Sequence, residues 1–101
     1  MKGNTLNEFI SDLCVNGGPE KEFVCYDKYY IIQAEGKEND SKTYLRLDIY
    51  ERVDDEAGQF INTVWFAGDS LTTCVDAFVD AKVFDGKTIY EAEKEIEVLF
   101  G

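Results

Sequence analysis

The sequence contains no histidine, a single proline and no long apolar run. Without histidine the chain cannot build a cysteine–histidine catalytic pair or a histidine-based zinc site. The longest apolar stretches, such as residues 29–32, are far shorter than the roughly 20 residues that a membrane-spanning helix requires. The polar N-terminal segment also lacks the apolar core of a signal peptide. These absences predict a cytoplasmic protein that does not insert into a membrane.

The chain has three cysteines. Cys14, Cys25 and Cys74 are widely spaced, form no C-x-x-C pair and lie among apolar neighbours. This pattern favours buried free thiols over disulfides or metal ligands. The sequence also lacks a glycine-rich phosphate loop, a nucleophile elbow and a cluster with metal-ligand spacing. We therefore expect a protein that is not an enzyme and that needs neither a cofactor nor a metal.

Negative charge is what the chain has in excess. Twenty-one acidic residues against ten basic ones give a net charge of −11 over 101 residues. Such a chain is repelled by nucleic acid and by anionic membranes, and it is attracted to basic surfaces, above all those of nucleic-acid-binding proteins. No basic patch with interleaved aromatic residues is present, which argues against direct binding of nucleic acid. A charge of this size is also compatible with a protein whose acidity only maintains its solubility.

The length and the hydrophobic content of 45% predict a single folded domain, residues 1–101. A capping box at Thr5 and Glu8 predicts the start of an amphipathic helix that ends at residues 16–19. The hydrophobic period then changes to two, as in β-strands. Four stretches have this pattern: residues 23–26, 29–34, 43–53 and 59–67. Asp27 and Lys28 interrupt the first two, either as a bulge or as a tight turn.

Two further helices are predicted after the strands. Asp69 or Ser70 caps the first of them, and a capping box at Thr88 and Glu91 begins the second, which we expect to run through Glu97. The predicted order is αβββαα, an α+β fold in which a three-stranded antiparallel meander packs against helices. The last apolar residues, 98–100, either complete the core or offer an apolar segment to a second subunit.

Three groups of acidic residues are the candidate partner-binding sites. One lies in or beside the loop after the first long strand, one at the following hairpin tip and one on the C-terminal helices. Their members are Glu35, Glu38 and Asp40; Asp54, Asp55 and Glu56; and Asp76, Asp80, Glu91, Glu93 and Glu95. Loops and helix faces are often acidic simply because they are solvated. Three consecutive acids at a tight tip repel one another where glycine or asparagine would satisfy the turn, so this group favours a function.

The alternation of apolar and polar residues over residues 43–53 predicts a strand with two different faces. Leu45, Leu47 and Ile49 alternate with a second set that we expect to point outward: Tyr44, Arg46, Asp48, Tyr50 and Arg52. An outward face of tyrosine and charge is either an ordinary cross-strand ladder or a contact surface. We assign Trp65 to the core because of the large apolar area that it would bury.

The order of elements resembles that of small acidic phage-encoded anti-CRISPR proteins that inhibit Cas9. Residues 52–60 are similar to the arginine, valine and acidic tip of that family, with its glycine and its following aromatic residue, and residues 75–81 and 91–97 resemble its paired helices. The resemblance implies an inhibitor in a bacterial host cell that occupies the DNA-reading site of a Cas effector, with carboxylates in place of DNA. It implies that Asp54, Asp55 and Glu56 face the arginines that read the bases, and that the helix acids make secondary contacts.

The leading hypothesis is therefore an acidic DNA mimic that blocks a basic nucleic-acid-binding protein, specifically a Cas effector with its guide RNA. The alternative is a protein-interaction or immunity-type module that neutralises an unrelated basic partner through the face carrying Tyr44 and Tyr50. A third hypothesis is a structural phage or plasmid protein whose charge serves solubility alone. The sequence leaves the oligomeric state open.

Overall fold

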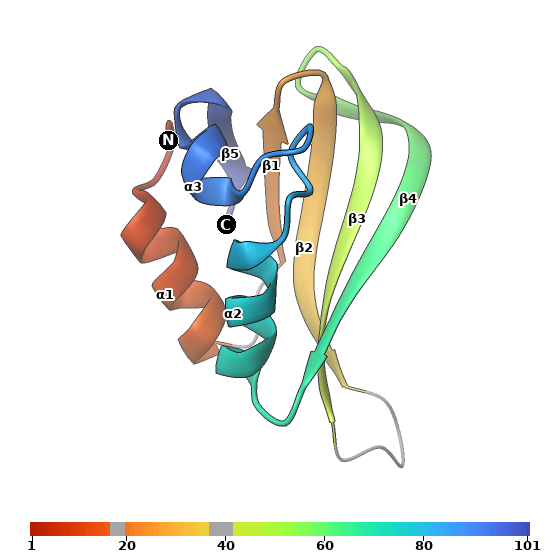
Figure 1. Ribbon diagram of the computed structural model, residues 1–101. Coiled ribbons are helices and arrows are strands. Elements are labelled where there is room, and N and C mark those ends of the chain that lie inside the picture. Colours follow the sequence, from red (N-terminus) through yellow and green to blue (C-terminus); the bar gives the residue numbers. More distant parts are fainter. Residues whose placement is uncertain (17–19, 37–41) are drawn as a thin grey trace.

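One antiparallel sheet with helices on one of its faces makes up the fold (Figure 1). The computed structural model describes residues 1–16, 20–36 and 42–101. Five strands follow the spatial order β4-β3-β2-β1-β5. The strands are β1 (Lys21–Cys25), β2 (Lys28–Gly36), β3 (Thr43–Val53), β4 (Glu56–Gly68) and β5 (Ile96–Phe100). The helices are α1 (Leu6–Asn16), α2 (Leu71–Asp80), the short α3 (Ile89–Ala92) and the 3₁₀ turn η1 (Glu93–Glu95).

The predicted α+β class and the antiparallel meander of β2, β3 and β4 are confirmed. The sheet is nevertheless larger than the predicted three strands. The sequence break near Asp27 is a tight turn, because Cys25 pairs with Lys28 and leaves only Tyr26 and Asp27 between the strands. β1 is therefore a strand of its own, paired with β2 on one side and with β5 on the other.

The core lies between the inner face of the sheet and the helices. Leu45 and Leu47 of β3 are fully buried there, which confirms the predicted alternation. Helix α2 contributes Cys74, Val75 and Phe78, and its N-cap is Ser70, whose hydroxyl accepts a hydrogen bond from the Thr73 amide. Four aromatic rings pack around β1 and β2: Phe23 stacks on Tyr30 with the ring centroids 5.2 Å apart, and Phe9 and Phe84 contact this pair at steeper angles.

The prediction of a helix through Glu97 is wrong. The capping box of Thr88 and Glu91 is present, but α3 ends at Ala92, and residues 96–100 form β5. Two effects explain the difference. Glutamates four residues apart repel one another on a helix, whereas pairing with β1 gives this segment a full ladder. Ile96 and Val98 enter the core, while Phe100 stays exposed.

The outer edge of β5 is covered by the N-terminal segment. Lys2 forms a parallel bridge with Glu97, in which the Lys2 amide donates to Ile96 O at 2.9 Å and the Val98 amide donates to Lys2 O at 2.8 Å. Gly3 continues this contact with a φ of +85°, a conformation that favours glycine.

A β-bulge changes the direction of side chains in β4. Ile49 pairs with Asn62, but the next residue, Tyr50, pairs with Phe60, so Ile61 is an extra residue on β4. The bulge places Phe60 on the outer face beside Tyr50, with the two rings 5.5 Å apart. An unbroken strand would instead put Phe60 on the same face as Asn62.

The assignment of Trp65 to the core is wrong, since its side chain is 45% exposed. Trp65 pairs with Arg46 on the outer face, and Val64 and Phe66 on either side of it fill the inner face. The cysteines agree better with prediction, because all three are free thiols, with Cys25 and Cys74 buried and Cys14 partly so. In the described part of the chain, no helix is long and apolar enough to cross a membrane.

Candidate functional site

The β3–β4 hairpin tip presents three carboxylates to solvent. Val53 pairs with Glu56, so Asp54 and Asp55 alone form the turn, and Asp54 has a φ of +57°. Aspartate tolerates this left-handed conformation better than most residues do. All three acids, Asp54, Asp55 and Glu56, are exposed. Among the described residues, no cation lies within ion-pair distance of the Asp54 or Glu56 carboxylate.

Arg52 fixes this tip to the neighbouring hairpin. Its Nε donates to Asp54 O at 2.8 Å, and its Nη2 donates to Asp55 Oδ1 at 3.1 Å. Its Nη1 donates to Tyr26 O at 3.0 Å, in the turn between β1 and β2. One guanidinium therefore holds both turns and neutralises only one of the three tip carboxylates. The tip is positioned before any partner arrives, which lowers the entropy that binding costs.

Three more acids, which the sequence analysis did not select, lie near Lys28 at the same end of the sheet. Lys28 donates to Asp27 Oδ1 at 2.8 Å. This hydrogen bond and the charge of Lys28 lower the pKa of Asp27, and the same hydrogen bond raises the pKa of Lys28, with smaller contributions from the charges of Asp85 and Glu51. We call the following set the hairpin-end acids: Asp27, Glu51, Asp54, Asp55, Glu56 and Asp85.

The turns at this end share an unusual backbone conformation. Tyr26, Asp54 and Asp85 have φ values of +53°, +57° and +54°, and they are the only described non-glycine residues with positive φ. Each such residue costs of order 1–3 kcal/mol and persists only where its surroundings fix it, and such residues gather at functional sites. Here Lys87 holds the Tyr26 turn, since its Nζ donates to the Tyr26 hydroxyl at 2.9 Å. The sequence indicates these positive-φ positions only weakly, because a polar residue or a tyrosine in a short turn is common.

Glu35 is separate from the hairpin-end acids. It lies toward the far end of β2, and Arg46 Nη1 donates to its carboxylate at 2.9 Å. This ion pair neutralises Glu35 within the protein and leaves it less available to a partner. Glu38 and Asp40, the other two predicted members of this group, lie outside the described residues.

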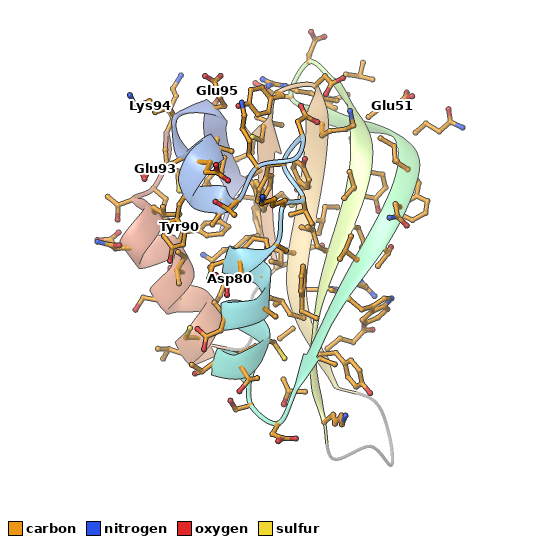
Figure 2. All side chains as sticks on the ribbon, in the orientation of Figure 1. Glu51, Asp80, Tyr90, Glu93, Lys94 and Glu95 are labelled. Carbon is orange, nitrogen blue, oxygen red and sulfur yellow. The ribbon has the colours of Figure 1, made fainter. Side chains whose placement is uncertain are left out.

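The acids of the C-terminal region form a third area, on the helix side. Asp76 and Asp80 are exposed on α2. Glu91 closes the capping box, and the Thr88 amide lowers the pKa of its carboxyl. Glu93 lies 3.8 Å from the Met1 amino group. Figure 2 shows Glu93 and Glu95 beside α3 on the margin formed by the helices, and Glu51 on the opposite margin.

The outer face of the sheet carries aromatic residues that no described helix covers (Figure 1). Tyr44 and Trp65 meet edge to face with their rings 6.1 Å apart, and the Arg46 guanidinium lies 6.0 Å from the Trp65 ring. Tyr50 and Phe60 form a second edge-to-face pair, and Phe60 is 54% exposed. Aromatic residues and arginine are enriched in protein interfaces. The sequence indicated the tyrosines of this face, but not Trp65 or Phe60.

Within the residues that the structure describes, we find neither a ligand-sized cavity nor a group of metal-ligating side chains. Comparisons with protein families, with curated proteins and with solved structures give no match to this chain. The candidate site consists of two surfaces: the hairpin-end acids, and the aromatic outer face formed by Tyr44, Tyr50, Phe60 and Trp65.

Proposed function

We propose that this protein binds a basic, nucleic-acid-binding partner and blocks it by presenting carboxylates where the partner expects phosphates and base edges. The observation that supports this proposal most strongly is the exposed tip of Asp54, Asp55 and Glu56, held by Arg52 at the end of the sheet where further acids lie. The narrower form of the proposal is that the partner is a Cas effector with guide RNA, whose motif-reading arginines the tip engages.

A fixed, charged tip of this kind suits a groove that normally binds nucleic acid. A partner that reads DNA holds arginines and lysines in a groove that attracts anions over a distance of about one Debye length, roughly 10 Å at 0.1 M salt. Carboxylates on a fixed turn enter such a groove without first losing conformational freedom. Binding of this type weakens steeply as salt rises, because it replaces counterions.

The test is a DNA-cleavage assay with a panel of Cas effector–guide complexes, in which the protein is added before or after the DNA. We expect inhibition only when the protein is added first. The triple variant Asp54→Asn/Asp55→Asn/Glu56→Gln should raise the concentration needed for inhibition at least about tenfold, which corresponds to about 1.4 kcal/mol.

The matched control removes two aspartates and one glutamate from helices α1 and α2: Asp76→Asn/Asp80→Asn/Glu8→Gln. We expect this variant to inhibit within about twofold of the unmodified protein, because these exposed residues lie on a different surface. Equal losses in both triple variants would mean that net charge alone acts, and would contradict the assignment to the tip. No inhibition across the panel would contradict a Cas effector as the partner.

A second candidate function rests on the aromatic outer face. An interaction or immunity-type module that neutralises an unrelated basic protein would use Tyr44, Tyr50, Trp65 and Phe60 as its contact residues, since aromatic anchors dominate interface energies. The double variant Tyr44→Ala/Tyr50→Ala separates the two candidates. In this second case it would weaken binding more than the tip variant does, and in the first case less.

A further inference from the structure

β4 is an edge strand without the usual protection of an edge. It is the outermost strand of the sheet, 13 residues long, and no described strand pairs with its far side. From Ala57 to Gly68 it contains no charged residue and no proline. Native proteins usually block such edges with lysine, proline or a short strand, because the exposed backbone groups pair readily with another chain. The devices that β4 does have are two bulges, one at Ile61 and one at Gly58 and Gln59 near the hairpin tip, and both lie before Asn62.

The direction of the backbone groups follows from the register of β3. The Arg52 amide donates to Asp27 O, toward the β2 side. Backbone groups alternate in direction along a strand, so the residues at odd positions of β3, such as Leu47 and Ile49, point theirs toward β4. Their partners in β4 are Val64 and Asn62. Thr63 and Ala67, which alternate with these partners, therefore direct their N–H and C=O groups to the free edge.

Charge argues against a second copy of this chain as the occupant. Two copies related by a two-fold axis would pair their β4 strands antiparallel, because such an interface uses the same surface of both. That arrangement brings the Asp54–Glu56 tip of one copy toward Asp69, which follows β4, of the other. Each copy also carries a net charge of −11. Acid would face acid at both ends of the new pair, which is unfavourable.

We propose that the free edge of β4 binds an extended segment of the basic partner as a sixth strand of the sheet. The segment has lysine or arginine at its ends, facing Asp69 and the hairpin tip, and apolar residues at alternate positions over Phe60 and Trp65. Backbone hydrogen bonds at an open edge supply affinity, and alternate side chains supply specificity. This inference rests on the proposed function, since it describes how the same basic partner docks.

The probe is a synthetic peptide with lysine at both ends and alternating valine and threonine between them. A second peptide with glutamate in place of lysine is the matched control. Both are titrated into the ¹⁵N-labelled full chain, and amide exchange and chemical shifts are recorded. We expect the lysine peptide to protect the amides of Thr63 and Ala67, while the glutamate peptide binds at least about tenfold more weakly.

Two substitutions test the edge itself. Thr63→Pro removes an edge-directed N–H and should weaken binding of the lysine peptide at least about tenfold. Thr63→Val is its control, because it keeps the N–H and removes only the hydroxyl that donates to Asp48 Oδ1 at 2.7 Å. Circular dichroism of both variants establishes that they remain folded, and Ala67→Pro provides a second edge variant if Thr63→Pro does not fold.

Two other outcomes overturn the inference, and a third supports it while it overturns the tip mechanism. Shift changes confined to residues 54–56, with unchanged binding in Thr63→Pro, would leave the acidic tip as the partner site and remove the edge; the proposed function would then survive without this inference. A doubled molecular mass of the chain alone, lost in Thr63→Pro, would show that β4 pairs with a second copy. If Thr63→Pro abolishes peptide binding while the tip variant still inhibits as the unmodified protein does, the edge stands and the tip mechanism fails.

Discussion

The two edges of the sheet are built in opposite ways. β5 is a short strand of five residues, and its outer side is occupied by the backbone of Lys2, with the Lys2 ammonium 3.6 Å from Glu97. β4 is 13 residues long, carries exposed aromatic residues and has no described strand beside it. The same chain thus protects one edge with its own N-terminal segment and leaves the other open. Protection was available to this fold, so the open edge of β4 calls for a functional explanation.

We expect the largest effect from removing a buried aromatic side chain of β1, compared with removing an exposed one from β5, the strand that pairs with it. Phe23→Ala empties a site that is fully buried and in contact with three other aromatic rings. The free energy of unfolding should fall by about 3–5 kcal/mol, which chemical denaturation measures. Phe100→Ala is the control, because Phe100 of β5 is 57% exposed and should cost about 1 kcal/mol or less. Equal costs would contradict the described packing.

The next effect concerns the cover of the β5 edge. Gly3→Ala adds a Cβ that would lie 2.5 Å from Val98 O, at a φ of +85°. We expect a loss of stability of about 1–3 kcal/mol, together with faster hydrogen exchange of the Val98 amide. Gly86→Ala is matched in φ, at +79°, but meets no atom within 4 Å. We expect Gly86→Ala to lower stability by only about 1 kcal/mol, because it introduces the backbone strain without the clash. If Gly86→Ala costs as much as Gly3→Ala, the contact with Val98 contributes nothing.

A third effect depends on pH and on the interior near β5. Burial raises the pKa of the Cys25 thiol from 9.0 to about 12, with smaller contributions from Asp85 and Glu95. Above pH 9 the unfolded chain loses this proton while the folded chain keeps it, so stability falls as pH rises from 9 toward 12. The loss from this group should reach no more than about 1.4 kcal/mol at pH 10. Denaturation series at pH 8 and pH 10 measure it, with Cys25→Ser as the comparison. A flat profile in the unmodified protein would contradict the burial of this thiol.

The smallest effect is expected on the open edge. Ile61→Thr changes the bulged residue of β4, which is exposed, and should alter stability by no more than about 0.5 kcal/mol. Thermal unfolding measures this change. A loss above about 2 kcal/mol would place Ile61 in a packed environment and would remove the contrast between the two edges.

The local patterns in the sequence predicted the elements whose structure depends on near neighbours. The strand of residues 43–53, the α2 stripe with its cap and the Thr88 capping box are all present. The errors occur where a distant segment decides. The Glu91–Glu97 segment begins with a helical capping box, and pairing with the distant strand β1 makes its last part a strand. Trp65 faces outward because the register with Arg46 fixes it, and no local signal reveals that register.

The candidate site follows the same rule. The tip of Asp54, Asp55 and Glu56 was visible as three consecutive acids, and the structure shows all three exposed. Asp27 and Asp85 were not predicted, since each is a single acid in a turn, and only the tertiary fold brings Asp85 near Lys28 and Asp27. The pair of Tyr50 and Phe60 depends on a bulge, and a bulge adds a residue without a sequence signature strong enough to predict.

The pairing of β1 with β5 has a consequence for the order of events during synthesis. β2, β3 and β4 join neighbours in the chain and can pair as soon as they leave the ribosome. Phe23 must wait for Val98, which is separated from it by most of the chain. Until residues 96–100 emerge, β1 has an open side, and the nascent protein exposes two unpaired strand edges instead of one. Contacts of such high sequence separation form slowly, so the nascent chain is most exposed to misassociation before residues 96–100 have paired with β1.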